Sequence, residues 1–276
     1  MDLSDPEALL LLTAAWLGLG SRRLRLLASG HDVLLREWVA DDAVPFLRQA
    51  RRYARGAAHR LQSMGAKMVT LGESAYPAGL RELADPPAFL TYRGRIDVEG
   101  ITIVGTRTPT RRAAELAYNV AARLGRPTIS GLALGIDAAV HRGSLSAYLP
   151  TLAYVGSGIA QVYPAEHRGL QEEIIACGGA VASEHLPEQE ASHASLVRRD
   201  RLQAAHGAAT LLIASDASGG AMHTMRFAQS LRKARFALEP SGEGEGGNRR
   251  AIQNGAIPLA MRVDDIVLQL RRALEN

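Results

Sequence analysis

Cysteine is nearly absent from this 276-residue chain, which contains Cys177 and no second cysteine. An internal disulfide and a metal cluster built on cysteine ligands are therefore excluded. The eight histidines show no HExxH motif or other close spacing of metal ligands. We expect neither a metal nor an organic cofactor.

Long apolar runs are also missing. The most hydrophobic N-terminal stretch, residues 8–19, is too short to cross a bilayer. It follows acidic residues, whereas a signal peptide begins with a basic segment. Apolar residues still make up 47% of the chain, which is enough for an ordinary core. These features predict a soluble, cytoplasmic protein with no membrane partner.

Aromatic residues and lysine are scarce as well. Aromatics make up 5% of the chain, which argues against binding through many stacked side chains. Lysine occurs only at positions 67 and 233, so arginine supplies most of the positive charge, and the net charge is +4. Arginine grips phosphate with a planar fork, but a GC-rich genome would favour arginine at least as well. The charge alone leaves the ligand open.

Two domains are predicted, a small helical module at residues 1–65 and an α/β domain at residues 66–276. Glycines at positions 18, 20 and 30 separate short apolar segments in the module. This pattern resembles SAM-like and helix-hairpin-helix modules, some of which hold DNA through glycine amides. Because the match is short, a plain helical bundle that packs on its neighbour is favoured over a DNA-binding hairpin.

The α/β domain begins with a proline-rich connector at residues 67–94, where we expect short strands. From residue 101 onward, apolar runs alternate with helical segments that begin near residues 111, 135, 165, 196 and 221. This alternation predicts an extended Rossmann-like parallel sheet with helices on both faces. The expected strands are residues 101–105, 127–131, 151–156, 180–184, 209–215 and 234–240, and residues 239–248 are expected to form a flexible loop.

Ligands of such sheets bind beyond the carboxyl ends of the strands. The loops at these ends are rich in glycine, serine and arginine, which suits an anion. We predict that DNA-binding residues lie there, namely Gly105, Arg107, Ser130, Gly131, Gly135, Gly156, Gly158, Arg198, Arg199, Arg201, Ser218, Gly219 and Thr224. Arg198, Arg199 and Arg201 are expected to form one patch for backbone phosphates.

A catalytic residue is not predicted in these loops, because no pair of nucleophile and base can be recognised. Asp137 and His141 lie four residues apart and share one helix face, so an acid–imidazole pair is conceivable. A structural role for Asp137, as a helix cap or loop anchor, is equally consistent with the sequence. We therefore expect a binding protein and not an enzyme.

Taken in order, the motifs of this chain resemble the DprA/Smf family. The resemblance extends in unbroken order over roughly residues 70–260. It rests on Tyr76-Pro77, Asp85-Pro86-Pro87, Gly94, residues 103–107, residues 130–137 with His141, Gly156-Ser157-Gly158, Tyr163-Pro164, Ser183-Glu184, Arg199-Asp200-Arg201, Ser218-Gly219 with Thr224, Gly247-Asn248 and Gly255-Ala256.

The resemblance implies single-stranded DNA binding in a basic cleft, a homodimer, and loading of a RecA-type recombinase during natural transformation. It implies that Arg107 holds a phosphate, that Ser130 and Gly131 allow close backbone contact, and that Arg199 and Arg201 extend the basic track. Asp200 departs from the family's asparagine and adds a negative charge to that track. Since few residues follow the Rossmann-like region, we also expect no winged-helix domain of the kind that many members carry. A role in phage or plasmid defence therefore stays open beside transformation.

A nucleotide-ligand sensor or nucleotide hydrolase of the related Rossmann-like group is the main alternative. Such an enzyme needs a carboxylate beside a ribose, and Asp137 or Glu184 could take that role. Those hydrolases carry a PGGxGTxxE motif, which this chain lacks. The sequence therefore favours DNA binding.

Overall fold

The computed structural model describes residues 2–41, 44–240 and 245–275. Its N-terminal part is a group of helices comprising α1 (Pro6–Trp16), α2 (Ser21–Ala28), α3 (Val33–Ala40) and α4 (Pro45–Ser63). Asp5 caps α1 by accepting a hydrogen bond from the amide of Glu7, and proline at the first helical position favours the same start. Tyr53 on α4 donates a hydrogen bond of 2.5 Å to Glu188, which ties the helices to the rest of the chain.

The described residues after α4 form a nine-stranded sheet. Its strands are β1 (Lys67–Thr70), β2 (Phe89–Gly94), β3 (Ile101–Val104), β4 (Thr128–Ser130), β5 (Thr151–Tyr154), β6 (Ala180–Ser183), β7 (Ala209–Leu212), β8 (Ala234–Leu238) and β9 (Ile257–Leu259). Their spatial order is β1-β2-β6-β5-β4-β3-β7-β8-β9. Strands β1 and β2 pair antiparallel with each other, and β2 pairs antiparallel with β6. The remaining pairs are parallel.

Helices cover both faces of this sheet, as the sequence predicts. One face carries α5 (Arg111–Arg123), α6 (Ile136–Ser146), α7 (Arg168–Ala176) and α11 (Val263–Glu275). The other carries the 3₁₀ turn η1 (Ala78–Glu82), α8 (His193–His206), α9 (Ala221–Ser230) and α10 (Gly246–Gln253). A second 3₁₀ turn, η2 (Ala165–His167), precedes α7. The core strands are buried at nearly every position because both faces are covered.

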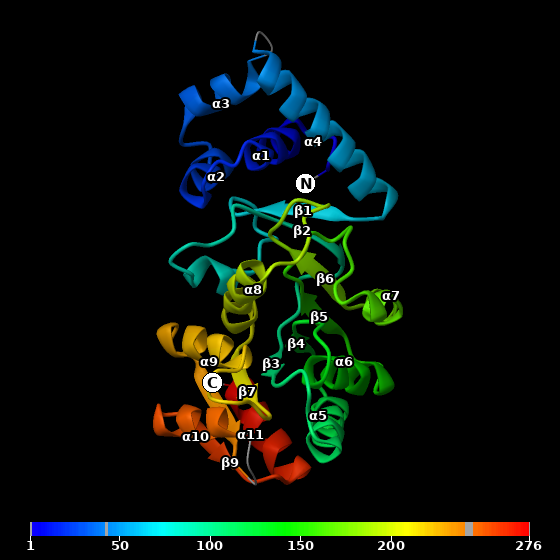
Figure 1. Ribbon diagram of the computed structural model, residues 1–276, viewed down its shortest axis with the longest axis vertical. Helices are drawn as coiled ribbons and strands as arrows, with labels where there is room; N and C mark the ends of the chain where they lie inside the picture. The colour runs from blue at the N-terminus through cyan, green and yellow to red at the C-terminus, as the bar shows by residue number, and fades with distance from the viewer. Residues whose placement is uncertain (1, 42–43, 241–244, 276) are drawn as a thin grey trace.

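The N-terminal helices lie at the end of the sheet marked by β1 and β2, whereas α10, β9 and α11 lie at the opposite end (Figure 1). Apolar side chains of α1 and α4 share one core with Met68 of β1 and Phe89 of β2. Helix α4 ends at Ser63 and β1 begins at Lys67, on either side of the expected domain boundary. The division into two domains stays a prediction.

The C-terminal part differs from the sequence prediction. Residues 239–248 were expected to form a flexible loop, but α10 begins at Gly246 and Asn248 is fully buried. Residues 241–244 of this segment lie outside the described residues. Strand β9 and helix α11 were not predicted. Strand β9 is the last strand of the sheet, and α11 covers the same face as α5 and α6.

Candidate functional site: a pocket at the sheet's switch point

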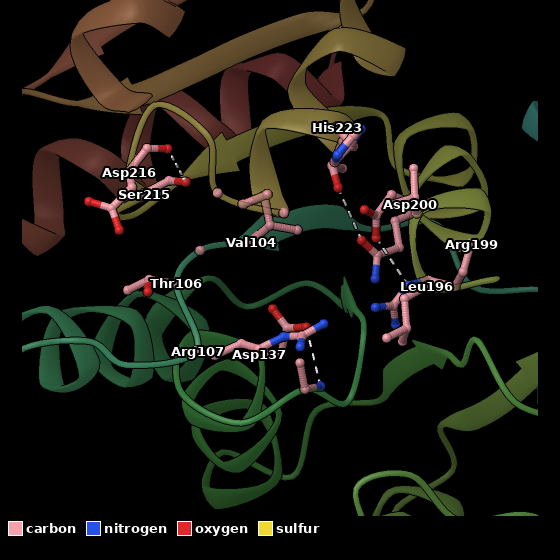
Figure 2. A pocket seen from close by; sticks show the side chains of 18 of the residues that line it. Val104, Thr106, Arg107, Asp137, Leu196, Arg199, Asp200, Ser215, Asp216 and His223 are labelled. Atoms are coloured by element: carbon pink, nitrogen blue, oxygen red, sulfur yellow. Dashed lines mark hydrogen bonds and ion pairs between the residues drawn. The ribbon is translucent and has the colours of Figure 1, made fainter. Parts of the chain in front are cut away.

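The order in which the chain adds parallel strands to the sheet reverses at β3. From β3 the chain proceeds through β4, β5 and β6 on one side, and then returns to place β7, β8 and β9 on the other. A crevice opens at such a switch point, because the loops after the two central strands diverge to opposite faces. A cavity of about 310 Å³ lies here, lined by the loops after β3 and β7 and by α8 (Figure 2).

Arg107 stands at the mouth of this pocket. Its side chain is solvent-exposed, in the loop that joins β3 to α5. Gly135 fixes the loop's position: its φ is +78°, and a Cβ at that residue would lie 2.5 Å from the carbonyl oxygen of Thr106. Gly105 similarly packs against Ile136, with 2.6 Å from its would-be Cβ to the Cγ1 atom. Both glycines therefore support Arg107 by close packing.

The opposite wall is the loop after β7 and the start of α9. Ser218, Gly219 and Thr224 lie in it, and α9 begins without a side chain that caps its amides. The buried side chain of Asn248 fixes this loop through hydrogen bonds to the backbone. Its Oδ1 accepts a hydrogen bond from the Ser215 amide at 2.9 Å, and its Nδ2 donates to Ile213 and Leu238, each at 3.0 Å. The amides of Met222 and His223 donate to the carbonyl oxygens of Gly219 and Gly220, so it is the dipole of α9 that favours an anion at this wall.

The floor of the pocket is formed by α8 and by the first turn of α6. Helix α8 begins with a capping box of Ser192 and Ser195, and it presents Arg199, Asp200 and Gln203 to the cavity. Arg199 donates hydrogen bonds of 2.5 Å to the carbonyl oxygens of Gly131 and Tyr154, and one of 3.1 Å to Asp200. Figure 2 shows Arg199 and Asp200 together on α8, with Arg107 and Asp137 on a neighbouring part of the wall.

Two carboxylates of the floor have perturbed acidity. Burial raises the pKa of Asp200 to about 6, with a further rise from the nearby Asp137, while the Arg199 guanidinium opposes the shift. Burial also raises the pKa of Asp137, again against the attraction of Arg199. The two buried acids therefore depend mainly on Arg199 for compensating positive charge, with a smaller contribution from Arg107 at Asp200.

Asp137 and His141 do not form the acid–imidazole pair that their spacing allows. Asp137 faces the pocket and accepts a 3.3 Å hydrogen bond from the amide of Ala133. His141 is fully buried, and its Nδ1 lies 2.8 Å from the Thr151 hydroxyl. Burial lowers the pKa of His141 to about 3, which keeps the ring neutral. Asp137 anchors its own loop, and His141 belongs to the core.

The predicted site residues divide into three groups. The main pocket contains Gly105, Arg107, Arg199, Ser218, Gly219 and Thr224. A smaller adjoining pocket of about 50 Å³ contains Gly131 and Gly156, and Arg107 and Arg199 border it too. The remaining residues line neither pocket, namely Ser130, Gly135, Gly158, Arg198 and Arg201.

Ser130 and Gly158 have packing roles in the structure. Ser130 is fully buried and donates a 2.8 Å hydrogen bond to the carbonyl oxygen of Ile103. A Cβ on Gly158 would lie 1.9 Å from the carbonyl oxygen of Leu186. Both positions therefore shape the strand-end loops from within.

The three arginines of α8 point to two sides, and so they do not form one patch. Arg201 is buried in an ion pair of 2.5 Å with Glu184, and Arg198 also reaches Glu184 at 3.4 Å. Arg198 and Arg201 both approach Asp85 as well. Only Arg199 faces the pocket. Positions 198 and 201 are three residues apart and share a helix face, a periodicity that could have separated them from Arg199.

Sequence reasoning missed several residues of the pocket, namely His193, Gln203, Asp216 and His223. Gln203 lies one helical turn after Arg199, so the same periodicity would have found it. Asp200 was noted only as a departure from a family pattern, and nothing in the sequence indicated that it is buried in the floor.

Within residues 2–41, 44–240 and 245–275, no group of three or more His, Cys, Asp or Glu side chains could hold a metal ion. In the same part of the chain, no helix has the length and apolarity needed to cross a membrane.

Several known proteins are similar to this chain in sequence. Protein Smf from Synechocystis is 31% identical over 207 residues, covering 71% of this chain and 52% of the relative. The DNA processing protein DprA from Bacillus subtilis is 29% identical over 209 residues, covering 72% and 69%. The chain thus spans about half the length of the first relative and about two thirds of the second.

Two solved structures share the fold. The X-ray structure of DNA processing protein A from Streptococcus pneumoniae superposes with a TM-score of 0.72 at 22% identity, covering 98% of this chain and 95% of that one. DNA processing protein A from Helicobacter pylori, whose structure concerns its single-stranded DNA binding mode, gives 0.66 at 24% identity, covering 75% and 96%. The family model described as DNA recombination-mediator protein A matches residues 67–271. This chain belongs to the DNA recombination-mediator protein A family.

Proposed function

We propose that this protein binds single-stranded DNA at the switch-point pocket, mainly through the sugar–phosphate backbone. The observation that carries the proposal is that the exposed Arg107 and the start of α9 line the same cavity. An arginine fork and the positive end of a helix dipole are both suited to a phosphate. Contacts of this kind hold a strand without reading its sequence.

Family membership supports a proposal for the biological role. We propose that the protein processes DNA in natural transformation or recombination, and that it acts as a homodimer that loads a RecA-type recombinase in the cytoplasm. Relatives named DNA processing protein DprA support the first part. The family description as a recombination mediator supports a recombinase partner. We further propose a binding protein without catalytic activity, as expected from the strand-end loops.

Fluorescence anisotropy with a labelled oligo-dT tests the proposal. We expect Arg107→Ala to weaken binding at least tenfold and to lower the salt dependence by about 0.7 in log–log slope, as for one lost phosphate contact on a single strand. Arg126→Ala is the matched control, because Arg126 is exposed but lies before β4, at the ends of the strands that point away from the pocket. Equal losses in the two variants would indicate unspecific attraction, and no binding at low salt would contradict the proposal.

Nucleotide binding is the second candidate, favoured by the acidic floor of the pocket. Asp137 lines the cavity and could contact a ribose hydroxyl. Glu184 could not take this role, since its side chain is buried and paired with Arg201. A screen of free nucleotides by thermal shift, with Asp137→Asn as the comparison, separates this candidate from DNA binding.

A further inference from the structure

The floor of the pocket is built to accept hydrogen bonds. Arg199, its one cation, already donates to two carbonyl oxygens and to Asp200. Asp200 and Asp137 lie around that guanidinium, and Asp200 is 8% exposed. A second phosphate would meet two carboxylates here, so the group that fits the floor is a hydrogen-bond donor.

Gln203 adds a donor beside these acceptors. It is 1% exposed and lines the pocket, and its Oε1 accepts from the Thr224 hydroxyl at 3.4 Å. Among the described residues, its Nε2 has no hydrogen-bond partner. A buried donor left unpaired is costly, which points to a ligand atom that completes it. Asp200 and Gln203 are three residues apart and therefore share one face of α8.

We propose that, on DNA bound as described above, this floor receives one guanine base. The Asp200 carboxylate accepts hydrogen bonds from the guanine N1–H and N2 amino groups, and Gln203 Nε2 donates to O6. Among the four DNA bases, guanine alone presents two neighbouring donors followed by an acceptor on its Watson–Crick edge. Thymine offers one donor between two acceptors, while adenine and cytosine offer a single amino group beside an acceptor.

The size and the charge of the pocket agree with this assignment. A cavity of about 310 Å³ is at the lower end of small-molecule sites and suits one nucleotide, not a run of bases. In this arrangement the anionic phosphate lies near Arg107 at the mouth, and the hydrogen-bond donors of the base lie near the carboxylates of the floor. Proteins that read an unstacked base use the same combination of a closed pocket and hydrogen bonds to its pairing edge. The proposal rests on the DNA-binding function above and adds base selection to it.

The test compares oligo-dT with the same oligomer carrying one central guanine. We expect the guanine oligomer to bind wild-type protein about tenfold more tightly, as for one well-placed bidentate contact. Hypoxanthine, which lacks the N2 amino group, and 2-aminopurine, which lacks O6 and N1–H, should each lose most of that gain. These base analogues need no variant protein, so folding does not enter the result.

Asp200→Asn provides the matched protein change, since it exchanges a carboxylate for an amide of the same shape. We expect this variant to lose the guanine preference, so that its affinities for the guanine and thymine oligomers become equal. Equal binding of the guanine and thymine oligomers by wild type, or a preference that survives in Asp200→Asn, would overturn the inference. Loss of binding to every oligomer would instead count against the DNA-binding function itself.

Discussion

Arg107 and Arg199 line the same pocket in opposite settings. Arg107 is exposed at the mouth, and its loop leaves the guanidinium facing solvent. Arg199 is 4% exposed on the floor, where it holds two carbonyl oxygens and a carboxylate. The pair shows that an arginine lining a cavity can be left free to contact a ligand, or can be engaged by polar groups of the protein itself. Which of the two applies depends on the polar groups that surround it.

Removing the floor arginine should have the largest effect on stability. Arg199→Ala leaves Asp137 and Asp200 buried without their shared cation, so we expect a loss of about 3–5 kcal/mol in the free energy of unfolding. Arg107→Ala should change that energy by less than about 0.5 kcal/mol, as is usual for an exposed residue. Urea denaturation of both variants measures the difference. Similar losses in the two would erase the distinction between mouth and floor.

The pH dependence of stability should sharpen the same distinction. The folded pKa of Asp200 is raised to about 6 from the ordinary value of 3.8. The folded state therefore binds more protons than the unfolded state between these values. It follows that the raised pKa of Asp200 does not lower the free energy of unfolding below about pH 4. Above about pH 6 it lowers that energy by its full amount, on the order of 3 kcal/mol.

Asp200→Asn isolates this contribution, because an amide does not titrate. The stability of the variant relative to wild type should rise as the pH increases from 4 to 7. Arg107→Ala should show a smaller change in the opposite direction, because the positive charge of Arg107 lowers the pKa of Asp200. A difference between Asp200→Asn and wild type that is flat with pH would mean that the floor carboxylate keeps its ordinary acidity. Denaturant unfolding at several pH values supplies the measurement.

Gly135→Ala should disturb the mouth while leaving the floor in place. The added Cβ would meet the Thr106 carbonyl oxygen at 2.5 Å and displace the Arg107 loop. We expect a stability loss of about 1–3 kcal/mol and weaker oligo-dT binding. Gly178→Ala is the control, since its φ of +77° carries the same strain while nothing lies within 4 Å of the new Cβ. DNA binding that is equally impaired in both variants would argue against a specific role for the loop.

Much of the fold was predictable from the sequence, and the reason is local. Each strand from β3 to β8 is a short apolar run that ends near glycine, serine or another small residue, and a helix follows most of them. The C-terminal elements lacked such signals. Helix α10 begins in a glycine-rich stretch that resembles a loop, and β9 spans three residues with Pro258 in the middle.

The site was predictable as a place but less so as a set of contacts. The rule that ligands bind at strand ends brought Arg107 together with Ser218, Gly219 and Thr224. It could not show that Arg201 turns toward Glu184, because that choice depends on a carboxylate contributed by the loop after β6. Nor could it show that Asp200 is buried, since burial is set by the packing of α8 against the sheet.

Strand β9 closes one border of the nine-stranded sheet with Pro258 at its centre. Proline has no amide hydrogen, so this border offers an interrupted row of donors to any strand that approaches it. The exposed Ile257 beside it would otherwise favour such growth. Two copies of this protein that meet at this end are therefore hindered from joining their sheets into a continuous ribbon, and a pairing there would have to use side chains instead of backbone.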